Sequence, residues 1–333
     1  MNEDKYTVVS TMKNEGPYII DWVAHYKTIG FDNIIVCTND CTDSTVDILL
    51  RLQEMGLVVH HPTIIRGGGI QRSALRQASR RYDIVMNAKW VFVCDVDEYL
   101  NVHMGDGSVQ ALVEGSGADA DVISVPWRVF GPNKIEVFED IPVTAQFKKG
   151  ELPWDAAKRP DTGKFVKSIY TNQYKFQRMG LHAPVSLDEY VATTKRVLPG
   201  GADYIVNGDR TENPPLFTHA QVNHYALRSM DSFLIKRARG RANHSHHVLG
   251  QEYWDRFNLN DETDTSISRY SKRSHALAAE LKSDPVLADL HARAVDWHQR
   301  KAGSIKLDPD MDELVNILKA DVKAPAKRRR SSK

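Results

Sequence analysis

Residues 90–100 read Trp90-Val91-Phe92-Val93-Cys94-Asp95-Val96-Asp97-Glu98-Tyr99-Leu100, an apolar run that stops abruptly at three acids within four positions. The apolar part has the length of one strand that is buried on both faces, which is typical of the centre of a parallel sheet. Aspartates are rare inside such strands, so we expect Asp95 and Asp97 at its carboxyl end, where open α/β sheets bind their ligands. An acidic turn that merely ends a strand would give the same pattern.

Two carboxylates that alternate along one rim repel each other unless a cation lies between them. Oxygen ligands of this kind suit Mg²⁺ or Mn²⁺, and such an ion can hold a substrate diphosphate. The stretch therefore predicts a divalent metal at Asp95 and Asp97.

Strand and helix patterns alternate along about the first 130 residues. Alternation at this spacing builds right-handed crossovers and a mostly parallel sheet flanked by helices, an α/β fold of the Rossmann-like type. Strands are predicted at 6–11, 33–38, 57–60, 90–95, 121–127 and 165–170, and helices at 17–29, 45–55, 71–86, 225–241, 271–300 and 311–320.

The composition is that of an ordinary globular protein, with 41% hydrophobic and 26% charged residues. Lys+Arg 44 against Asp+Glu 43 gives no overall field that would attract nucleic acid, so no nucleic-acid partner is expected. Three cysteines predict no disulfide framework, and Cys37 and Cys41 are better explained as buried or incidental thiols than as a metal pair. No run approaches the ~20 apolar residues of a membrane span, and no signal peptide is recognised, so we expect a cytoplasmic protein.

Three loops follow predicted parallel strands and should meet at one edge of the sheet, at residues 13–16, 39–44 and 95–98. The first, Lys13-Asn14-Glu15-Gly16, supplies a cation, polar side chains and a backbone that a ligand can approach closely. In the second, Asn39 and Asp40 offer acceptors for a nucleobase edge or ribose hydroxyls, whereas Asp43 or Ser44 suits a helix cap.

The run Gly67-Gly68-Gly69 matches neither a P-loop nor the dinucleotide-binding pattern, and a flexible loop explains it. Gln71, Arg72 and Arg76 follow at a helix start, where backbone N–H groups and side chains favour anions. A diphosphate contact, with Gln71 as the candidate, and a solvated helix face are both compatible with this pattern.

Several motifs in the same order resemble the family 2-like glycosyltransferases. Residues 12–26 are similar to the opening of that group, 39–45 to its nucleotide-binding loop, and 95–99 to its Asp-x-Asp-Glu-aromatic signature. The resemblance runs from about residue 6 to about 260. Its later part rests on Val125-Pro126-Trp127-Arg128-Val129-Phe130-Gly131, Lys167-Ser168-Ile169, Leu181-His182-Ala183-Pro184, Asn223-His224-Tyr225, Lys236 and Arg239-Gly240.

The resemblance implies a GT-A fold and sugar transfer from a nucleotide-sugar donor, expected to be a UDP-sugar, to a glycan or lipid-linked acceptor with inversion. It divides the chain into a domain at 1–260, with a nucleotide-sugar half at about 1–130 and an acceptor half at about 131–260. A helical extension at 261–322 and a disordered basic tail at 323–333 would follow.

By position, the resemblance also implies roles for individual residues. Asp97 would ligate the metal and Asp95 would face the ribose or the metal. Asp40 would bind the base. A late histidine would complete the metal site, and His224 is preferred to His182, which would instead help to orient the acceptor. The nucleotide pocket would be lined by Lys13, Asn14 and Glu15, with Asn39 and Gln71 beside it.

The acceptor hydroxyl has to lose a proton, usually to a nearby carboxylate. Glu98, Glu136 and Asp155 are the candidates, and nothing in the sequence separates them.

Two other functions fit part of the pattern. A sugar-phosphate nucleotidyltransferase also needs paired acids, but it usually opens with a Gly-rich loop carrying Arg and Lys where this chain has residues 13–16. A non-catalytic protein with a nucleotide pocket would have little reason to keep Asp95, Asp97 and Glu98 together.

Two charged or titratable clusters remain. His244-Ser245-His246-His247 suggests zinc, but adjacent histidines rarely point the same way and no cysteine accompanies them, so solvated histidines are expected. The basic end, with Lys327-Arg328-Arg329-Arg330 and Lys333, predicts either a solubilising tail or a weak, peripheral contact with anionic lipid at the inner face of the membrane.

Overall fold

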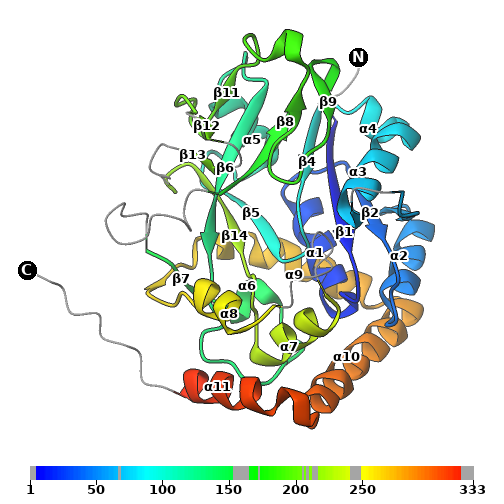
Figure 1. Ribbon diagram of the computed structural model, residues 1–333. Helices are drawn as coiled ribbons and strands as arrows, with labels where there is room; N and C mark the ends of the chain where they lie inside the picture. Colours follow the sequence, from blue (N-terminus) through cyan, green and yellow to red (C-terminus); the bar gives the residue numbers. More distant parts are fainter. Residues whose placement is uncertain are drawn as a thin grey trace, which may run out of the picture.

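The computed structural model describes residues 5–66, 69–152, 165–171, 173–204, 206–207, 210–211, 217–240 and 249–323. Its centre is one mixed sheet with the strand order β3-β2-β1-β4-β8-β6-β14-β5, and β11 pairs with β6 (Figure 1). Its strands are β1 (Tyr6–Met12), β2 (Asn33–Thr38), β3 (Val59–Pro62), β4 (Trp90–Val93), β5 (Glu98–Val102), β6 (Val122–Val129), β8 (Val166–Tyr170), β11 (Arg196–Val197) and β14 (Ala220–His224).

The remaining elements surround this sheet. The helices are α1 (Gly16–Thr28), α2 (Thr45–Glu54), α3 (Ile70–Arg81), α4 (Asp83–Met86), α5 (Val109–Gly115), α6 (Val143–Gln146), α7 (Met230–Ala238), α8 (Gln251–Phe257), α9 (Ser271–Leu281), α10 (Pro285–Lys306) and α11 (Asp312–Lys323). Short pairs are formed by β7 (Lys149–Gly150) with β15 (Glu262–Thr263), β9 (Phe176–Arg178) with β10 (Val185–Ser186), and β12 (Val206–Asn207) with β13 (Arg210–Thr211). Single 3₁₀ turns lie at Gln173–Lys175, Asp188–Tyr190, Ser266–Tyr270 and Pro309–Met311.

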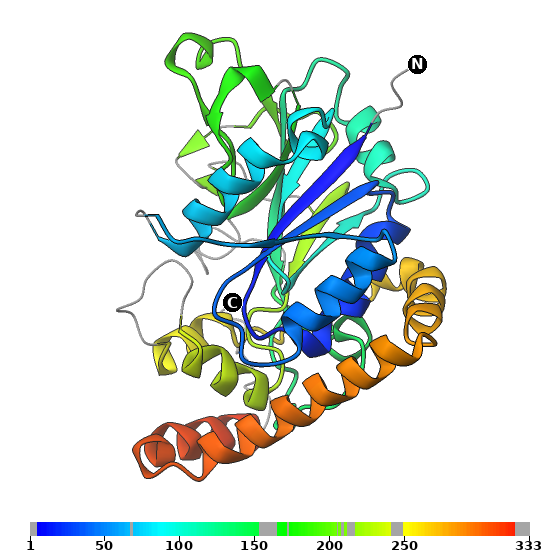
Figure 2. The ribbon, with the colours of Figure 1, turned by 90° about the vertical axis from the view of Figure 1, so that its right-hand side faces the viewer.

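The sheet is covered by helices on both faces because its central strands bury both sets of alternating side chains. In β1, Val8 belongs to the core that includes α1 and α2, whereas Val9 belongs to the core on the α3 side. Figure 2 shows α3 and the pair α1 and α2 on opposite sides of the sheet. The predicted α/β class with a mostly parallel sheet is confirmed.

Strands β1, β2, β3 and β4 are parallel, as predicted, so their carboxyl ends share one edge. The sheet becomes mixed at β8, which is antiparallel to both β4 and β6, and again at β5, which is antiparallel to β14. The antiparallel β8 places residues from far along the chain directly beside the acidic turn that follows β4.

Three predicted helices differ from the structure. The helix at 71–86 is divided by Tyr82, which has an extended backbone (φ −115°, ψ 116°). The helix at 271–300 is divided before Pro285, since Asp284 caps a new helix by accepting a hydrogen bond from the Leu287 N–H at 2.9 Å. The helix predicted from 225 begins only at Met230, after the cap at Ser229.

The C-terminal helices pack against the rest of the protein. Ile305 of α10 and Leu318 of α11 share a core with Phe233 of α7 and Trp254 of α8. Near the middle of α10, a Cβ on Gly16 would lie 2.6 Å from the Ala294 Cβ, so only glycine allows this close approach. Among the described residues, no helix is both long and apolar enough to cross a membrane.

We expect Leu318→Ala to lower the free energy of unfolding by about 2–5 kcal/mol, because the side chain is fully buried and its removal leaves a cavity. Leu307→Ala is the matched control, since Leu307 is 84% exposed and its loss should change stability by no more than about 0.5 kcal/mol. Urea unfolding followed by circular dichroism measures both. Equal midpoints for the two variants would show that α11 is not part of the cooperative fold.

Candidate active site

A cleft of about 470 Å³ lies at the carboxyl edge of the parallel strands, within the size range of small-molecule sites. The loops after β1, β2 and β4 all contribute to it, so the predicted meeting of the three loops is observed. One part of the lining is polar and comes from Lys13, Asn39, Gln71, Asp95 and Asp97. The other is rich in rings and comes from Trp127, Phe165, His182, His224, Tyr253, Arg256 and Phe257.

Asp95 is held by groups from two other segments. Lys167 of β8 is buried and places its Nζ 2.9 Å from Asp95 Oδ2 and 3.2 Å from Glu98 Oε2. Gln71 of α3 donates to Asp95 Oδ1 at 3.2 Å. Gln71 therefore reaches the site as expected, whereas Arg72 and Arg76 do not line the cleft. Lys167 thus places a positive charge directly beside Asp95.

Glu98 lies behind the cleft and is fully buried. Burial, with the negative charges of Asp95 and Asp97, raises the pKa of its carboxyl to about 8, although Lys167 acts in the opposite direction. A buried acid that keeps its proton at neutral pH, and does not line the cleft, is poorly placed to act as the general base. Its Oε2 instead accepts a hydrogen bond from the Asp95 N–H at 2.9 Å and shapes the turn.

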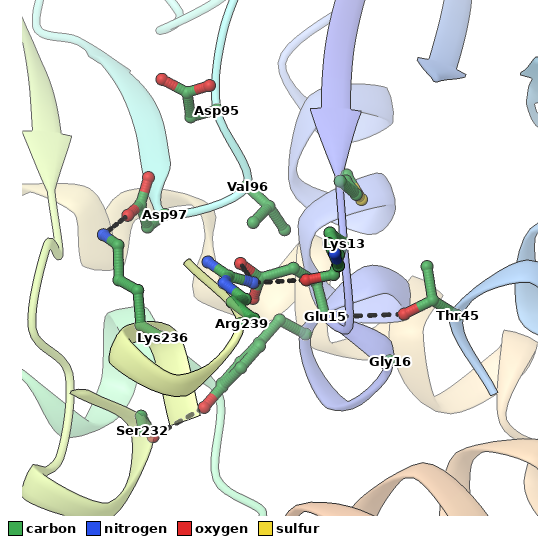
Figure 3. A network of polar contacts seen from close by, with 12 residues as sticks. Lys13, Glu15, Gly16, Thr45, Asp95, Val96, Asp97, Ser232, Lys236 and Arg239 are labelled. Atoms are coloured by element: carbon green, nitrogen blue, oxygen red, sulfur yellow. Dashed lines mark hydrogen bonds and ion pairs between the residues drawn. The ribbon is translucent and has the colours of Figure 1, made fainter. Parts of the chain in front are cut away.

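Asp97 forms the second ion pair of the turn, with Lys236 of α7 at 2.6 Å (Figure 3). Burial by itself would raise the pKa of Asp97, but Lys236, His224 and Arg228 outweigh burial and hold the pKa well below its usual range. The carboxylate is therefore ionised throughout the physiological range. Figure 3 also shows that Asp95 and Asp97 point to different parts of the cleft.

His224, at the end of β14, lies next to Asp97. Its Nε2 is 3.8 Å from Asp97 Oδ2, and burial lowers the pKa of the ring to about 3, so the imidazole is neutral at physiological pH. The ring contacts Trp127 at a tilt of 43°, with centroids 4.2 Å apart, and its Nδ1 has no hydrogen-bond partner among the described residues. A neutral imidazole beside an ionised carboxylate is a donor pair that fits a divalent ion.

Within the part of the chain that the structure describes, no three His, Cys, Asp or Glu side chains converge on one point as a metal site would require. Asp97 and His224 supply two donors, which suits an ion that takes its other ligands from a diphosphate and water. Asp95 is turned toward Lys167 and Gln71 instead. The thiols of Cys37 and Cys41 are free.

The nucleotide-side residues separate into two groups. Lys13 and Asn39 line the cleft, and Asp40 is exposed at its rim, where its Oδ2 accepts from Asn39 at 3.1 Å. Asn14 is buried and uses both ends of its amide on Thr42, with Oδ1 accepting at 2.7 Å and Nδ2 donating at 3.1 Å. Asn14 therefore joins the first two loops to each other.

Glu15 is buried and anchors two arginines. Arg228 reaches it at 2.8 Å, and Arg239 of α7 pairs with its other oxygen and also donates to the Lys13 carbonyl (Figure 3). The Arg228 guanidinium stacks on the ring of Tyr18 at 3.6 Å. Glu15 thus positions the loop and α7, and its charge is compensated within the protein.

The C-terminal extension reaches this network. His298 of α10 lies 3.3 Å from the Tyr18 hydroxyl and 3.4 Å from Ser232 Oγ, and burial lowers the pKa of its ring to about 3. Tyr18 and Ser232 are themselves 2.8 Å apart, one turn of α7 before Lys236. Sequence reasoning missed His298 and Arg228, because no local pattern marks residues that meet only through tertiary packing.

His182 lies in the ring-rich wall, 5.2 Å from Trp127 and 5.7 Å from Phe165 between ring centroids. Its Nδ1 is 2.9 Å from the Val166 carbonyl oxygen, so Nδ1 carries the proton and Nε2 is an acceptor. Of the other two candidate bases, Glu136 lies near the start of α7 and does not line the cleft. Asp155, the histidines at 244–247 and the end of the basic tail lie outside the described residues.

The fold is of the α/β class, with a mixed sheet flanked by helices and a cleft at the carboxyl edge of its parallel strands. The model of glycosyltransferase family 92 matches residues 9–260, so the chain belongs to this family and is a glycosyltransferase. The prediction of a glycosyltransferase is confirmed, and the family that the chain matches is family 92. The nucleotidyltransferase and the non-catalytic binding protein are therefore no longer needed as explanations.

No curated protein matches the sequence. Among solved structures, residues 1–349 of TarS from S. aureus are 10% identical, with a TM-score of 0.35 and coverage of 96% of this chain and 88% of that chain. Glucosyl-3-phosphoglycerate synthase from Mycobacterium tuberculosis, in complex with Mn²⁺, uridine diphosphate and glucosyl-3-phosphoglycerate, is 17% identical, with a TM-score of 0.34 and coverage of 62% and 73%.

The raised pKa of Glu98 predicts a pH-dependent stability difference between wild type and Glu98→Gln in metal-free buffer. Between the usual value of 4.5 and about 8, the unfolded chain has lost a proton that the folded protein keeps, so wild-type stability falls as pH rises. The free energy of unfolding of Glu98→Gln, relative to that of wild type, should therefore rise by up to about 1.4 kcal/mol per pH unit. This difference should become constant above about pH 8.

Denaturant unfolding at pH 5, 6, 7, 8 and 9 gives this difference, and Glu280→Gln on the exposed face of α9 is the matched control. A difference that is the same at every pH would mean that Glu98 is ionised throughout.

Proposed function

We propose that the protein transfers a sugar from a nucleotide-sugar donor, a UDP-sugar, to a hydroxyl of a glycan or lipid-linked acceptor with inversion, assisted by Mn²⁺ or Mg²⁺. The observation that supports this most directly is the pair Asp97 and His224. An ionised carboxylate and a neutral imidazole lie 3.8 Å apart and open into a cleft whose nucleotide side carries Lys13.

Departure of the sugar leaves negative charge on the nucleoside diphosphate, and prearranged positive groups lower the barrier most. Lys13, Lys236 and Arg239 line the cleft and supply such groups. A bound divalent ion would be held by Asp97 and His224, and would neutralise part of the same charge. Lys167 keeps Asp95 fixed for a contact with the ribose, and Asn39 with Asp40 would bind the base.

The acceptor hydroxyl would approach from the ring-rich side. His182 offers Nε2 as a hydrogen-bond acceptor there, so His182 would orient the hydroxyl and take its proton. This assignment replaces Glu98, which is buried away from the cleft.

The cell compartment is part of the same proposal. A cytoplasmic enzyme with a weak contact between residues 327–333 and anionic lipid would suit a membrane-linked acceptor.

Asp97→Asn should lower sugar transfer by roughly a hundredfold or more, because it removes the negative charge that a divalent ion and Lys236 both need. Wild type should lose activity in EDTA and regain it with Mn²⁺. The assay follows release of nucleoside diphosphate from a panel of nucleotide sugars. Asp289→Asn on the exposed side of α10 is the control, and thermal unfolding checks that Asp97→Asn is folded. Full wild-type activity in EDTA would rule out the metal.

Substitutions of His224 and His182 should change different kinetic quantities, the Mn²⁺ requirement and kcat. His224→Ala should raise the Mn²⁺ concentration for half-maximal rate by at least about tenfold, since it removes a metal donor. His182→Ala should leave that concentration unchanged and lower kcat with acceptor by roughly a hundredfold or more. Metal titrations at saturating donor and acceptor distinguish them, and the opposite result would exchange the two roles.

A further inference from the structure

Arg256, on α8, is a cation at the mouth of the cleft with no carboxylate partner among the described residues. Its guanidinium instead lies 5.5 Å from the ring centroid of Phe165 and 5.4 Å from that of Phe257. Contact with rings uses the face of a guanidinium, so its hydrogen-bonding edge can bind another group.

Most other charged residues of the cleft form ion pairs with residues of opposite charge. Lys236 is paired with Asp97 at 2.6 Å, Arg239 with Glu15, and Asp95 with Lys167 at 2.9 Å. Along the described lining, only Lys13 and Arg256 have no carboxylate within ion-pair distance. Lys13 follows β1 on the nucleotide side, whereas α8 lies on the β14 side of the sheet (Figure 1).

The wall next to Arg256 is made of rings that are tilted against one another by 34° to 59°. Trp127 and Phe165 are 5.3 Å apart between ring centroids, and His182 lies within 5.7 Å of both. Ring faces of this kind can bury the apolar face of a sugar ring, while its hydroxyls remain free for the polar groups of the cleft.

We propose that the acceptor is an anionic sugar, with its ring against Trp127 and Phe165 and its phosphate or carboxylate on Arg256. This proposal rests on the glycosyl-transfer function and adds the acceptor's chemical class. A guanidinium binds either anion through two parallel hydrogen bonds, and the nearby rings reduce its competition with water. Arg256 thereby selects the acceptor, while the donor diphosphate is bound from the side of Lys13.

The experiment measures binding and turnover separately. For binding, wild type with UDP and Mn²⁺ is titrated by calorimetry with glucose 6-phosphate, glucuronate and glucose. For turnover, the same three compounds are tested as acceptors, together with other hexose phosphates, hexuronates and their parent hexoses. The phosphate and the carboxylate arms show which anion is preferred. We expect an anionic sugar to bind at least about tenfold more tightly than its neutral parent.

Arg256→Ala should abolish this preference, and Arg256→Lys should keep part of it, because the charge remains but the paired hydrogen bonds are lost. UDP affinity should be retained in both variants, because Arg256 contacts the acceptor and not the donor diphosphate. Arg293→Ala, on the exposed face of α10, is the matched control.

Equal binding of charged and neutral sugars by wild type would overturn the proposal. So would a loss of UDP affinity in Arg256→Ala that matches the loss of acceptor affinity, since Arg256 would then belong to the donor site. Failure of glycosyl transfer itself has a different signature, in which wild type releases no nucleoside diphosphate from any nucleotide sugar. The calorimetric preference still decides whether Arg256 selects an anionic sugar in that case.

Discussion

The structure depends on positive charges that balance the acids of one turn. Asp95, Asp97 and Glu98 lie within four positions, and such a cluster would be strongly unfavourable in a buried position without counter-charges. Lys167 and Lys236 provide them, one from each side of the turn. Removing one partner of a buried pair typically costs about 3–5 kcal/mol, because it leaves the other charge buried without compensation.

This requirement explains the mixed sheet. A further parallel strand beside β4 would have needed another crossover, whereas the antiparallel β8 brings Lys167 to the turn directly. The second lysine arrives on α7, which begins after β14 and is held by the pair of Glu15 with Arg239. Segments that lie 72 and 139 residues further along the chain thus orient the acids of this turn.

Much of the fold was predictable, because β2 and β4 carry continuous apolar runs and the loops after β1, β2 and β4 are rich in polar residues. The acids at 95–98 were found for the same reason, as an interruption of a buried strand. One error came from local ambiguity, because Tyr82 ends a helix without any glycine or proline. The burial of Glu98 was not predictable either, since an acid at the end of a strand carries no local sign of whether it is exposed. The partners Arg228 and His298 were not predictable, since their contacts with Glu15 and Tyr18 arise only when distant helices pack together.

The family match ends at residue 260, yet α10 and α11 contact α7 and α8, two helices that contribute residues to the cleft. His298 touches Ser232 of α7, Lys306 pairs with Asp231 at 2.8 Å, and Trp254 of α8 donates to Asp321 at 2.8 Å. The enzyme is therefore not modular at that boundary. A change in the wall of the cleft therefore has to be compatible with α10 and α11, whose residues do not line it, so substitutions in these two helices can alter the cleft from a distance.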